Sequence, residues 1–204
     1  MSVKGAPSKD YPKYDDSAKT YDAILVMSFG GPEGQEDVIP YMENVTRGRN
    51  IPRERLEEVS EHYRMFGGVS PINAQNRALI AALEEELAEH DIDLPVYFGN
   101  RNWHPMIEDT MRQMKEDGIQ NAVAFFTSGF SCYSGCRQYR ENIMTAQRAI
   151  GEGAPTVDKI RVFYNHPGFI YPMVENVKQA LAQWDEDERE DVHIVYTAHS
   201  IPMG

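Results

Sequence analysis

The sequence predicts an α/β protein with a Rossmann-like, doubly wound parallel sheet flanked by helices. Short apolar runs, typical of strands that are buried on both faces, alternate with longer segments whose apolar residues recur at helical spacing. Small and polar residues follow each apolar run, and the sites of such sheets lie beyond the carboxyl ends of the strands. This alternation favours right-handed crossovers between parallel strands.

The composition is that of a globular protein, with 204 residues of which 41% are hydrophobic and 25% are charged. No apolar run reaches the roughly 20 residues that span a bilayer, so no stable membrane anchoring is expected. The net charge of −12 argues against nucleic acid as a partner, because phosphate binding requires a basic face. Two cysteines are too few for a disulfide framework and favour the reducing cytoplasm.

The predicted elements alternate along the chain. Strands are expected at 22–29, 94–99, 122–126 and 160–164, and a last strand is expected to start at Val192 and lead to His199. Helices are expected at 36–45, at 53–65, from Ser70 to about His90, from about Ile107 to Gly118, up to about Ile150, and across Met173 to Trp184. The helix after Ser70 is expected to bury an apolar stripe made of Ile72, Leu79, Ile80, Leu83 and Leu87.

Three segments are expected: a disordered polar tail at 1–20, an N-terminal Rossmann-like domain at 21–165, and the start of a second similar domain at 166–204. The strand expected at 22–29 and the strand expected from Val192 end in the same pattern, which is a small residue, a ring, two more residues and a proline. Two half-domains that face one another across a cleft explain this likeness, and so does chance. Because no helix follows the last strand to cover it, the chain is expected to be the front part of a longer protein.

Candidate functional residues stand at strand ends and in one loop. His199 fits a proton acceptor or a metal ligand, or else an ordinary loop histidine. Arg47 and Arg49 are either surface charge or a recognition site for carboxylates. Ser70 is either the N-cap of its helix or a contact for an anionic group. With the rings at other strand ends, which are Phe29, Trp103, Tyr133 and Tyr139, these residues suit a flat aromatic ligand that carries carboxylates.

Several familiar sites are excluded by spacing. The turn at 30–34 is not a dinucleotide fingerprint, because Pro32 removes an amide that a phosphate needs. Cys132 and Cys136 have no second cysteine pair, which argues against a zinc site within this chain. Ser128 and Ser200 lack the strand-to-helix context of a nucleophile elbow.

Five motifs, in the same order along the chain, resemble those of the ferrochelatases, and the likeness is greatest to the actinobacterial branch that makes haem through coproporphyrin. It covers residues 21–204, and its motifs are Ser28-Phe29-Gly30-Gly31-Pro32, Val45-Thr46-Arg47-Gly48-Arg49, His62-Tyr63 through Phe66-Gly67-Gly68-Val69-Ser70-Pro71-Ile72-Asn73, Tyr97-Phe98-Gly99-Asn100-Arg101-Asn102-Trp103 and Thr197-Ala198-His199-Ser200-Ile201-Pro202. The resemblance implies a chelatase fold of two Rossmann-like domains that hold a tetrapyrrole between them. It also implies insertion of Fe(II), the metal substrate, into coproporphyrin III.

The resemblance assigns roles to individual residues. His199 matches the family's active-site histidine, a proton acceptor or iron ligand. Ser70 and Tyr139 match positions that contact the porphyrin, and Tyr63 lies in the motif that contains Ser70. Arg47 and Arg49 fall in the loop beside the pocket, where a role in binding propionates is a hypothesis. Phe29 stands where some relatives carry an iron-ligating tyrosine, and a phenyl ring is expected to pack against the macrocycle instead.

Cys136 lies near the place where cluster-bearing relatives have the first cysteine of a 2Fe-2S cluster. The resemblance puts the other three cluster ligands, and a glutamate partner of the histidine, in a C-terminal part that this sequence does not contain. The resemblance therefore makes such a cluster possible in the full-length protein but not completable in this chain. Two rival interpretations remain in the tetrapyrrole class: insertion into protoporphyrin IX, and a non-catalytic tetrapyrrole-binding or metal-binding fragment. A flavodoxin-like domain with an unrelated ligand is a third, and the oligomeric state is not predicted.

Overall fold

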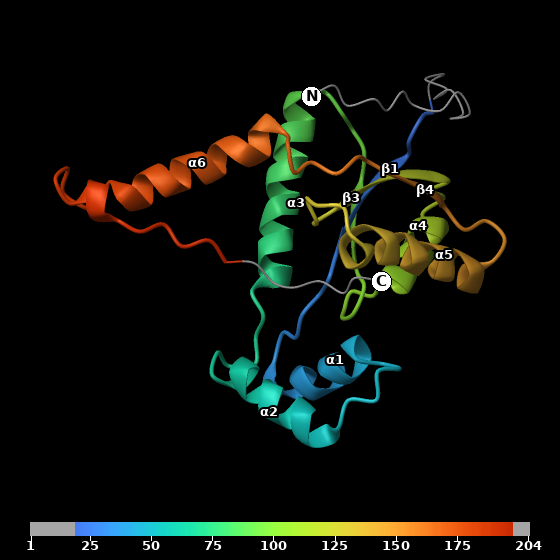
Figure 1. The fold of residues 1–204 in the computed structure, drawn as a ribbon. Helices are drawn as coiled ribbons and strands as arrows, with labels where there is room; N and C mark the ends of the chain where they lie inside the picture. Colours follow the sequence, from blue (N-terminus) through green and yellow to red (C-terminus); the bar gives the residue numbers. More distant parts are fainter. Residues whose placement is uncertain (1–18, 198–204) are drawn as a thin grey trace, which may run out of the picture. The chain divides into compact units, whose positions relative to one another are not determined.

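A parallel four-stranded sheet forms the centre of the computed structural model, which describes residues 19–197. Its strands are β1 (Ala23–Ser28), β2 (Val96–Asn100), β3 (Asn121–Phe126) and β4 (Thr156–Lys159), in the order β2-β1-β3-β4. All three pairings are parallel, and Ser28 of β1 stands opposite Asn100 of β2. The predicted α/β class with a doubly wound parallel sheet is therefore confirmed (Figure 1).

The main core lies on one face of the sheet, under helices α4 (Ile107–Glu116) and α5 (Gln138–Ile150). Alternate residues of β1 and β3 point into this core, as the two-residue period of a strand requires. Met111 and Met114 of α4, Ile143 of α5 and Phe126 of β3 are almost completely buried there. The methionines that the sequence assigned to packing are core residues, as expected.

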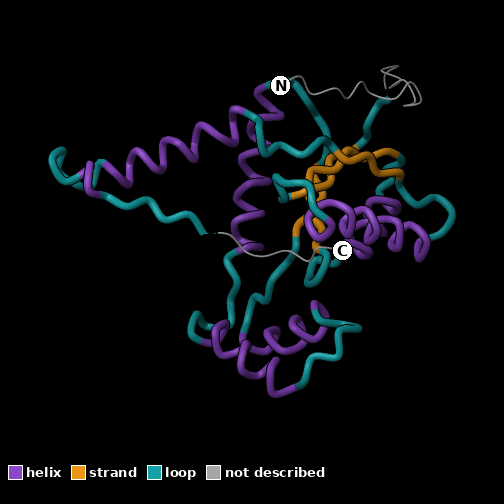
Figure 2. The backbone as a smooth tube through the Cα atoms, viewed as in Figure 1, coloured by secondary structure: helices purple, strands orange, loops and turns teal. Residues whose placement is uncertain are grey.

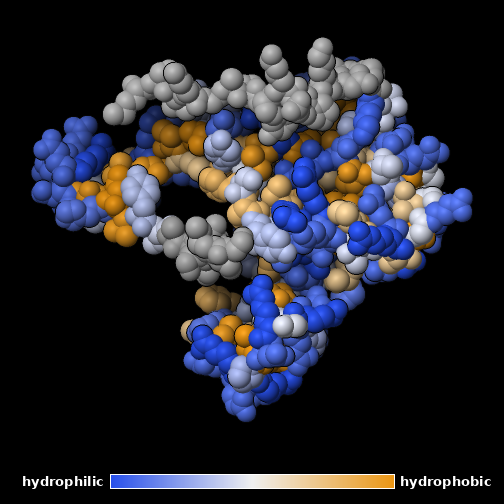
Figure 3. All heavy atoms as spheres, turned by 45° about the vertical axis from the view of Figure 1, so that its right-hand side comes forward, coloured by the Kyte–Doolittle hydropathy of each residue, from blue (hydrophilic) through white to orange (hydrophobic). Residues whose placement is uncertain are grey.

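A second, smaller core holds helices α1 (Val38–Val45) and α2 (Arg53–Arg64) together, after the short 3-10 turn η1 (Gln35–Asp37). Val38, Tyr41 and Met42 of α1 and Leu56 of α2 are its buried residues. In Figure 3, orange atoms gather in the middle of this α1–α2 part and blue atoms surround them. The two helices lie beyond the end of the sheet in Figures 1 and 2, and the chain between β1 and β2 runs through them.

Helix α3 (Ile72–Glu89) runs on the side of the sheet opposite to α4 and α5 (Figure 1). The expectation that its apolar stripe is buried is wrong for the described residues, because Leu79 is 41% exposed and Ile80, Leu83 and Leu87 are half-buried. The fully buried side chains of α3 are Asn73 and Asn76 instead. Periodicity locates the apolar face of a helix, but the face is buried only where another element packs on it.

Two predicted strands are displaced or absent within the described residues. The strand expected at 160–164 is β4, four residues earlier, because Asn121 to Ala124 of β3 pair with Thr156 to Lys159. Thr156 also donates a hydrogen bond to Asn121, from Oγ1 to Oδ1 at 2.7 Å. Residues 192–197 are irregular, and Tyr196 is 86% exposed. A strand forms only when its backbone groups find a partner, and no strand in the described part of the chain pairs with this segment.

Contacts divide the chain into a unit that ends at Ile160 and a unit that begins at Arg161. The second unit contains helix α6 (Pro167–Leu181) and the 3-10 turn η3 (Arg189–Asp191). The predicted boundary at 165/166 lies five residues further along, and the interpretation of the second unit as the start of a similar domain stays a prediction. Within residues 19–197, no helix combines the length and the apolar character needed to cross a bilayer.

Candidate functional site

The loops that follow β1, β2 and β3 meet at one edge of the sheet. The strand order reverses between β1 and β3, and ligands of such sheets bind in the crevice outside this reversal. Phe29 directly follows β1, Arg101 directly follows β2, and Tyr139 lies in the first turn of α5 after β3. The edge where the sequence placed its candidates is therefore the edge where the structure brings these three side chains together.

Backbone hydrogen bonds fix the positions of these loops. The amide of Arg101 donates to Ser28 O at 3.0 Å, and the amide of Asn102 donates to Phe29 O at 3.1 Å. The Asn102 side chain donates to the same Phe29 oxygen at 3.2 Å. On the other side, Thr127 Oγ1 donates to Ser28 Oγ at 2.9 Å. The ring of Phe29 and the guanidinium of Arg101 are thus held on neighbouring, cross-linked loops.

Arg101 is the central cation of this edge. Its Cζ atom lies 4.8 Å from the centroid of the Tyr139 ring and 5.6 Å from that of the Phe29 ring, within the range of cation–π attraction. Its Nε donates to Asn142 Oδ1 at 2.8 Å and its Nη1 donates to Ser134 O at 3.1 Å. Two rings and two neutral acceptors therefore orient the guanidinium, and no carboxylate of the described residues forms an ion pair with it.

Burial shapes the electrostatics of this edge. Desolvation is the main cause that lowers the pKa of Arg101, and the nearby positive charge of Arg49 contributes in the same direction. Desolvation also raises the pKa of Tyr139, although the guanidinium of Arg101 opposes it. The Tyr139 side chain is therefore a neutral phenol near neutral pH, and Arg101 remains charged because arginine holds its proton far above neutral pH. A half-buried cation beside a phenol attracts an anionic group.

An apolar hollow of about 690 Å³ opens beside these loops and is lined by His62, Tyr63, Phe66, Val69, Ser70 and Pro71. We call it the apolar hollow. Phe66 is 78% exposed on its wall, and its neighbour Met65 is 77% exposed. The volume lies within the roughly 300–1,000 Å³ that small-molecule sites occupy. The hollow therefore offers uncovered aromatic and aliphatic surface to a ligand.

Ser70 is held at the border between the apolar hollow and the loop after β1. Its amide donates to Pro32 O at 2.8 Å, and Glu33 forms an antiparallel bridge with Val69. A Cβ atom on Gly31 would lie 2.6 Å from Ser70 Cβ, so only glycine fits there. Ser70 Oγ accepts from the amide of Ile72 at 3.5 Å, the outer limit of a hydrogen bond. The expected N-cap at Ser70 is wrong by one residue, because α3 begins at Ile72 and Pro71 occupies the N-cap position.

Aromatic rings connect the apolar hollow to Phe29. The Tyr41 ring stands edge-on to the rings of Tyr63 and Trp103, with centroids 6.0 Å and 6.1 Å away. Phe29, Tyr63 and Trp103 all pack on the core of α1 and α2. Desolvation raises the pKa of Tyr41 strongly, so this buried phenol stays neutral. The rings that line the site thus rest on a packed core, which holds their orientation.

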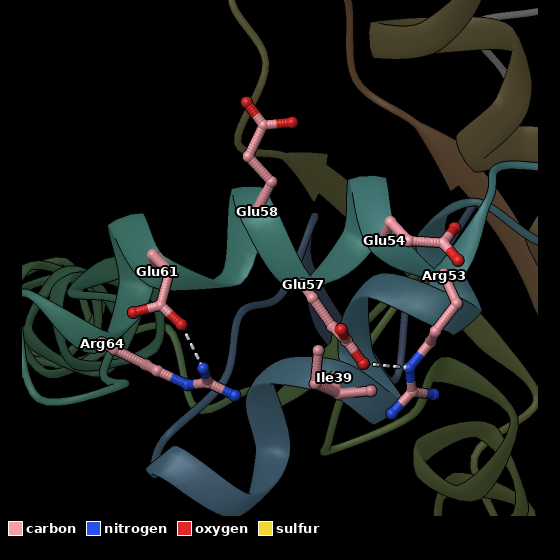
Figure 4. Close-up of a pocket in the computed structure, with 7 residues that line it drawn as sticks. All are labelled: Ile39, Arg53, Glu54, Glu57, Glu58, Glu61 and Arg64. Carbon is pink, nitrogen blue, oxygen red and sulfur yellow. Dashed lines mark hydrogen bonds and ion pairs between the residues drawn. The ribbon is translucent and has the colours of Figure 1, made fainter.

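Another hollow, lined by side chains of α1 and α2, has the opposite character (Figure 4). Its lining is Ile39, Arg53, Glu54, Glu57, Glu58, Glu61 and Arg64. Arg53 forms an ion pair with Glu57 at 3.0 Å, and Arg64 forms one with Glu61. We call it the charged hollow. Its exposed i, i+3 and i, i+4 pairs are those of an ordinary solvated helix surface.

Cys132 precedes a π-helical turn, η2 (Tyr133–Arg137), at the start of α5, and Cys136 lies within it. Cys132 Sγ already accepts from the amide of Gly135 at 3.1 Å, and Cys136 is half-buried. A 2Fe-2S cluster needs four ligands, and two cysteines supply only half of them. The residues of this chain therefore do not fit such a cluster, and residues 19–197 contain no group of three or more His, Cys, Asp or Glu side chains arranged for a metal ion.

The structure unites some of the predicted site residues and leaves others apart. Phe29 and Tyr139 flank Arg101, while Tyr63 and Ser70 line the apolar hollow. Arg49 is exposed on its loop but close enough to influence Arg101. Arg47 is exposed on the same turn, and no ion pair in the described part of the chain holds it. His199, with the predicted catalytic and metal-binding role, lies outside the described residues.

Sequence patterns do not single out the residues that organise this edge. Arg101 stands in one of the five motifs, but its position there predicts no role. Its signal was an arginine directly after an apolar run, in a protein of net charge −12. Asn73 and Asn100, both at most 1% exposed, were not singled out either. Asparagines in a buried position have no periodic signal, because their importance depends on partners that are distant in the sequence.

The ferrochelatase family model matches residues 21–204 of the chain. The chain is a member of the ferrochelatase family. It is 61% identical to a ferrochelatase of Rhodopirellula baltica over 184 residues, which are 90% of this chain and 52% of that protein. It is 55% identical to a coproporphyrin III ferrochelatase of Streptomyces coelicolor and 53% identical to one of Mycolicibacterium smegmatis, covering 51% and 54% of those proteins. The chain thus spans about half the length of the curated relatives it matches.

Proposed function

We propose that the protein is a lyase-type metal chelatase that inserts Fe(II) into coproporphyrin III to form coprohaem, a step of haem biosynthesis in the cytoplasm. The identity of 53–55% to proteins named coproporphyrin III ferrochelatases supports the substrate. The single structural observation that carries the proposal is the arrangement of Arg101 between the Phe29 and Tyr139 rings, on loops bordered by the apolar hollow. Flat apolar surface next to a fixed cation suits a porphyrin with propionate groups.

The described residues have separate tasks in this proposal. Tyr63 and Phe66 offer ring surface to one side of the macrocycle, and Phe29 packs near its edge. Arg101 binds a propionate, because its guanidinium has no carboxylate partner among the described residues and a charge-assisted bond to a carboxylate is among the stronger hydrogen bonds. Ser70 and Tyr139 donate neutral hydrogen bonds to the substrate. Arg47 and Arg49 provide further cations for the other propionates.

The chemical step replaces two pyrrole N–H protons of the porphyrin by one Fe(II) ion. The porphyrin loses two protons and gains a doubly charged metal, so the overall charge balances. His199 is the proposed acceptor of a proton or ligand of the entering iron, since a neutral imidazole serves either task near pH 7. Its role comes from the sequence motif alone.

The test is anaerobic incubation of the full-length protein that carries this sequence with Fe(II) and coproporphyrin III. The porphyrin absorption bands are followed against a protein-free control. The proposal expects catalytic formation of coprohaem, with no such activity in His199→Ala and largely preserved porphyrin binding. Binding without turnover in the wild-type protein would favour a non-catalytic tetrapyrrole-binding protein, and no binding would end the proposal.

Protoporphyrin IX is the alternative substrate, because the relative from Rhodopirellula baltica carries only the name ferrochelatase. Coproporphyrin III has four propionates and protoporphyrin IX has two. The cations Arg47, Arg49 and Arg101 near one edge favour the substrate with more carboxylates. A kcat/KM for protoporphyrin IX equal to or above that for coproporphyrin III would select the alternative.

A further inference from the structure

The side chains of Asn73 and Asn100 form a buried amide pair beneath the candidate site. Asn73 is 1% exposed in the first turn of α3, and Asn100 is completely buried at the end of β2. Asn100 Nδ2 donates to Asn73 Oδ1 at 2.9 Å, across 27 positions of sequence. This bond joins two elements on which different site residues stand.

Both amides also reach the backbone of the site loops. The carbonyl oxygen of His104, in the loop after β2, accepts from Asn100 Nδ2 at 3.0 Å and from Asn73 Nδ2 at 3.1 Å. Asn73 Nδ2 also lies 3.4 Å from Gly31 O, in the loop after β1. The pair therefore connects α3, the end of β2 and both loops at a single point.

The positions of these contacts relate the pair to the site. Phe29 lies two residues before Gly31, Ser70 lies three residues before Asn73, and Arg101 directly follows Asn100. Small displacements of the pair are therefore transmitted to the ring, the hydroxyl and the guanidinium together. A shift of the amide pair would therefore move Phe29, Ser70 and Arg101 together.

The energetics argue against a role in stability alone. Asn100 Oδ1 is buried and has no hydrogen-bond partner in the described structure, and a buried acceptor without a partner destabilises a fold. Two amides in a buried position are less favourable than well-packed apolar side chains unless every group is satisfied. The pair instead fixes the positions of α3, the end of β2 and the loops after β1 and β2 relative to one another.

We propose that Asn73 and Asn100 are positioning residues, which set the relative placement of Phe29, Ser70 and Arg101 for the porphyrin. The expected effect on porphyrin binding rests on the proposed function. The expected effect on the loops does not. The pair contacts no substrate itself. It fixes the loops whose side chains do.

The test compares Asn73→Ala, Asn100→Leu and the double variant in the full-length protein that carries this sequence. Hydrogen exchange of the 100–104 segment reports on the loops without any ligand, since the amides of Arg101 and Asn102 donate to the end of β1 and to the residue that follows it. Titration with coproporphyrin III gives Kd. Thr110→Val is the matched control, because Thr110 Oγ1 donates to Phe98 O of the same strand at 2.8 Å from helix α4, on the other side of the sheet.

The expected result is exchange at 101–102 at least about tenfold faster and Kd raised about tenfold in each asparagine variant, as for the loss of one hydrogen bond to an ordered loop. The double variant is expected to be no worse than the worse single one, because the two side chains act as a unit. Thr110→Val is expected to lower Tm while leaving exchange at 101–102 and Kd unchanged.

Two results would overturn the inference. One is that amide hydrogen exchange at residues 101–102 stays unchanged in both asparagine variants while their Tm falls as much as that of Thr110→Val. The other is faster exchange with an unchanged Kd, which would show that the loops move without consequence for the ligand. If the wild-type protein binds no porphyrin, the proposed function fails, and the exchange data still decide whether the pair fixes the loops.

Discussion

Helix α2 lines two hollows of opposite chemistry. The apolar hollow takes His62 and Tyr63 from its last turn and continues into the exposed Phe66, whereas the charged residues of the other hollow recur at i, i+3 and i, i+4 spacing along the whole helix. In the charged hollow, the charged side chains form ion pairs with one another at the surface, as Arg53 does with Glu57. In the apolar hollow, Tyr63 stands edge-on to the buried Tyr41, and Phe66 leaves apolar surface uncovered. A surface whose charges are already paired needs no ligand, whereas covering an exposed apolar surface with a ligand is favourable.

The largest expected effect, on stability and binding together, comes from a substitution at the border of the apolar hollow. Gly31→Ala places a Cβ 2.6 Å from Ser70 Cβ and 2.7 Å from its Oγ. Overpacking of this kind costs about 1–3 kcal/mol, and it displaces Ser70 from the hollow. We expect a lower free energy of unfolding in urea and at least a roughly tenfold weaker affinity for coproporphyrin III. Gly34→Ala is the control, since its extended backbone suits any residue and its Cβ would meet only the flexible end of the Glu36 side chain. A binding loss as large as that of Gly31→Ala would contradict the role of the Gly31–Ser70 contact.

The second effect removes the cation next to the apolar hollow. Arg101→Met keeps much of the side chain's length but deletes the charge between the Phe29 and Tyr139 rings. A hydrogen bond to a charged group contributes about 1.5–3 kcal/mol, so we expect Kd for coproporphyrin III to rise roughly tenfold to a hundredfold. The salt dependence of Kd should weaken as well. A Kd within twofold of the wild-type value would show that Arg101 does not bind the porphyrin.

The third effect compares the hollows directly. Phe66→Ser removes exposed apolar surface from the wall of the apolar hollow, and Glu54→Gln removes one charge from the charged hollow. Covering a phenylalanine is worth about 1.5–3 kcal/mol, so Phe66→Ser should weaken porphyrin binding on the order of tenfold with little change in Tm. Glu54→Gln should change neither affinity nor Tm measurably. Equal effects of the two substitutions would erase the distinction between the hollows.

The smallest effect concerns pH. Glu33 bridges to Val69 at the border of the apolar hollow, and the hydrogen bond from Arg77 lowers the pKa of its carboxyl group. A carboxyl group with a lowered folded-state pKa stabilises the fold above its unfolded value, and this contribution is lost as the pH falls through the folded value. Both side chains are about half exposed, so solvent limits the effect to at most about 1 kcal/mol. Glu33→Gln should reduce the free energy of unfolding at pH 7, and this difference should shrink as the pH falls through the folded-state pKa of Glu33. Urea unfolding of both proteins across this pH range checks it.

The sequence alone determined the alternation of strands and helices, the parallel sheet and the edge at which the site lies. Each of these follows from local patterns, such as the apolar runs of β1 and β3, which neighbouring residues specify. The sequence also proposed Phe29 and Tyr139 as site candidates, because rings after a buried strand mark the edge of a parallel sheet. It proposed Ser70 either as a helix cap or as a contact for an anionic group.

Only the tertiary structure decided which of these side chains meet. The shift of the fourth strand to Thr156–Lys159 depends on pairing with β3, and the exposure of Leu79 depends on what packs on α3. Arg101 between two rings and Asn73 bonded to Asn100 are contacts between segments that are far apart in sequence. Such contacts leave no periodic signal, because their free energy arises from partners that only folding brings together.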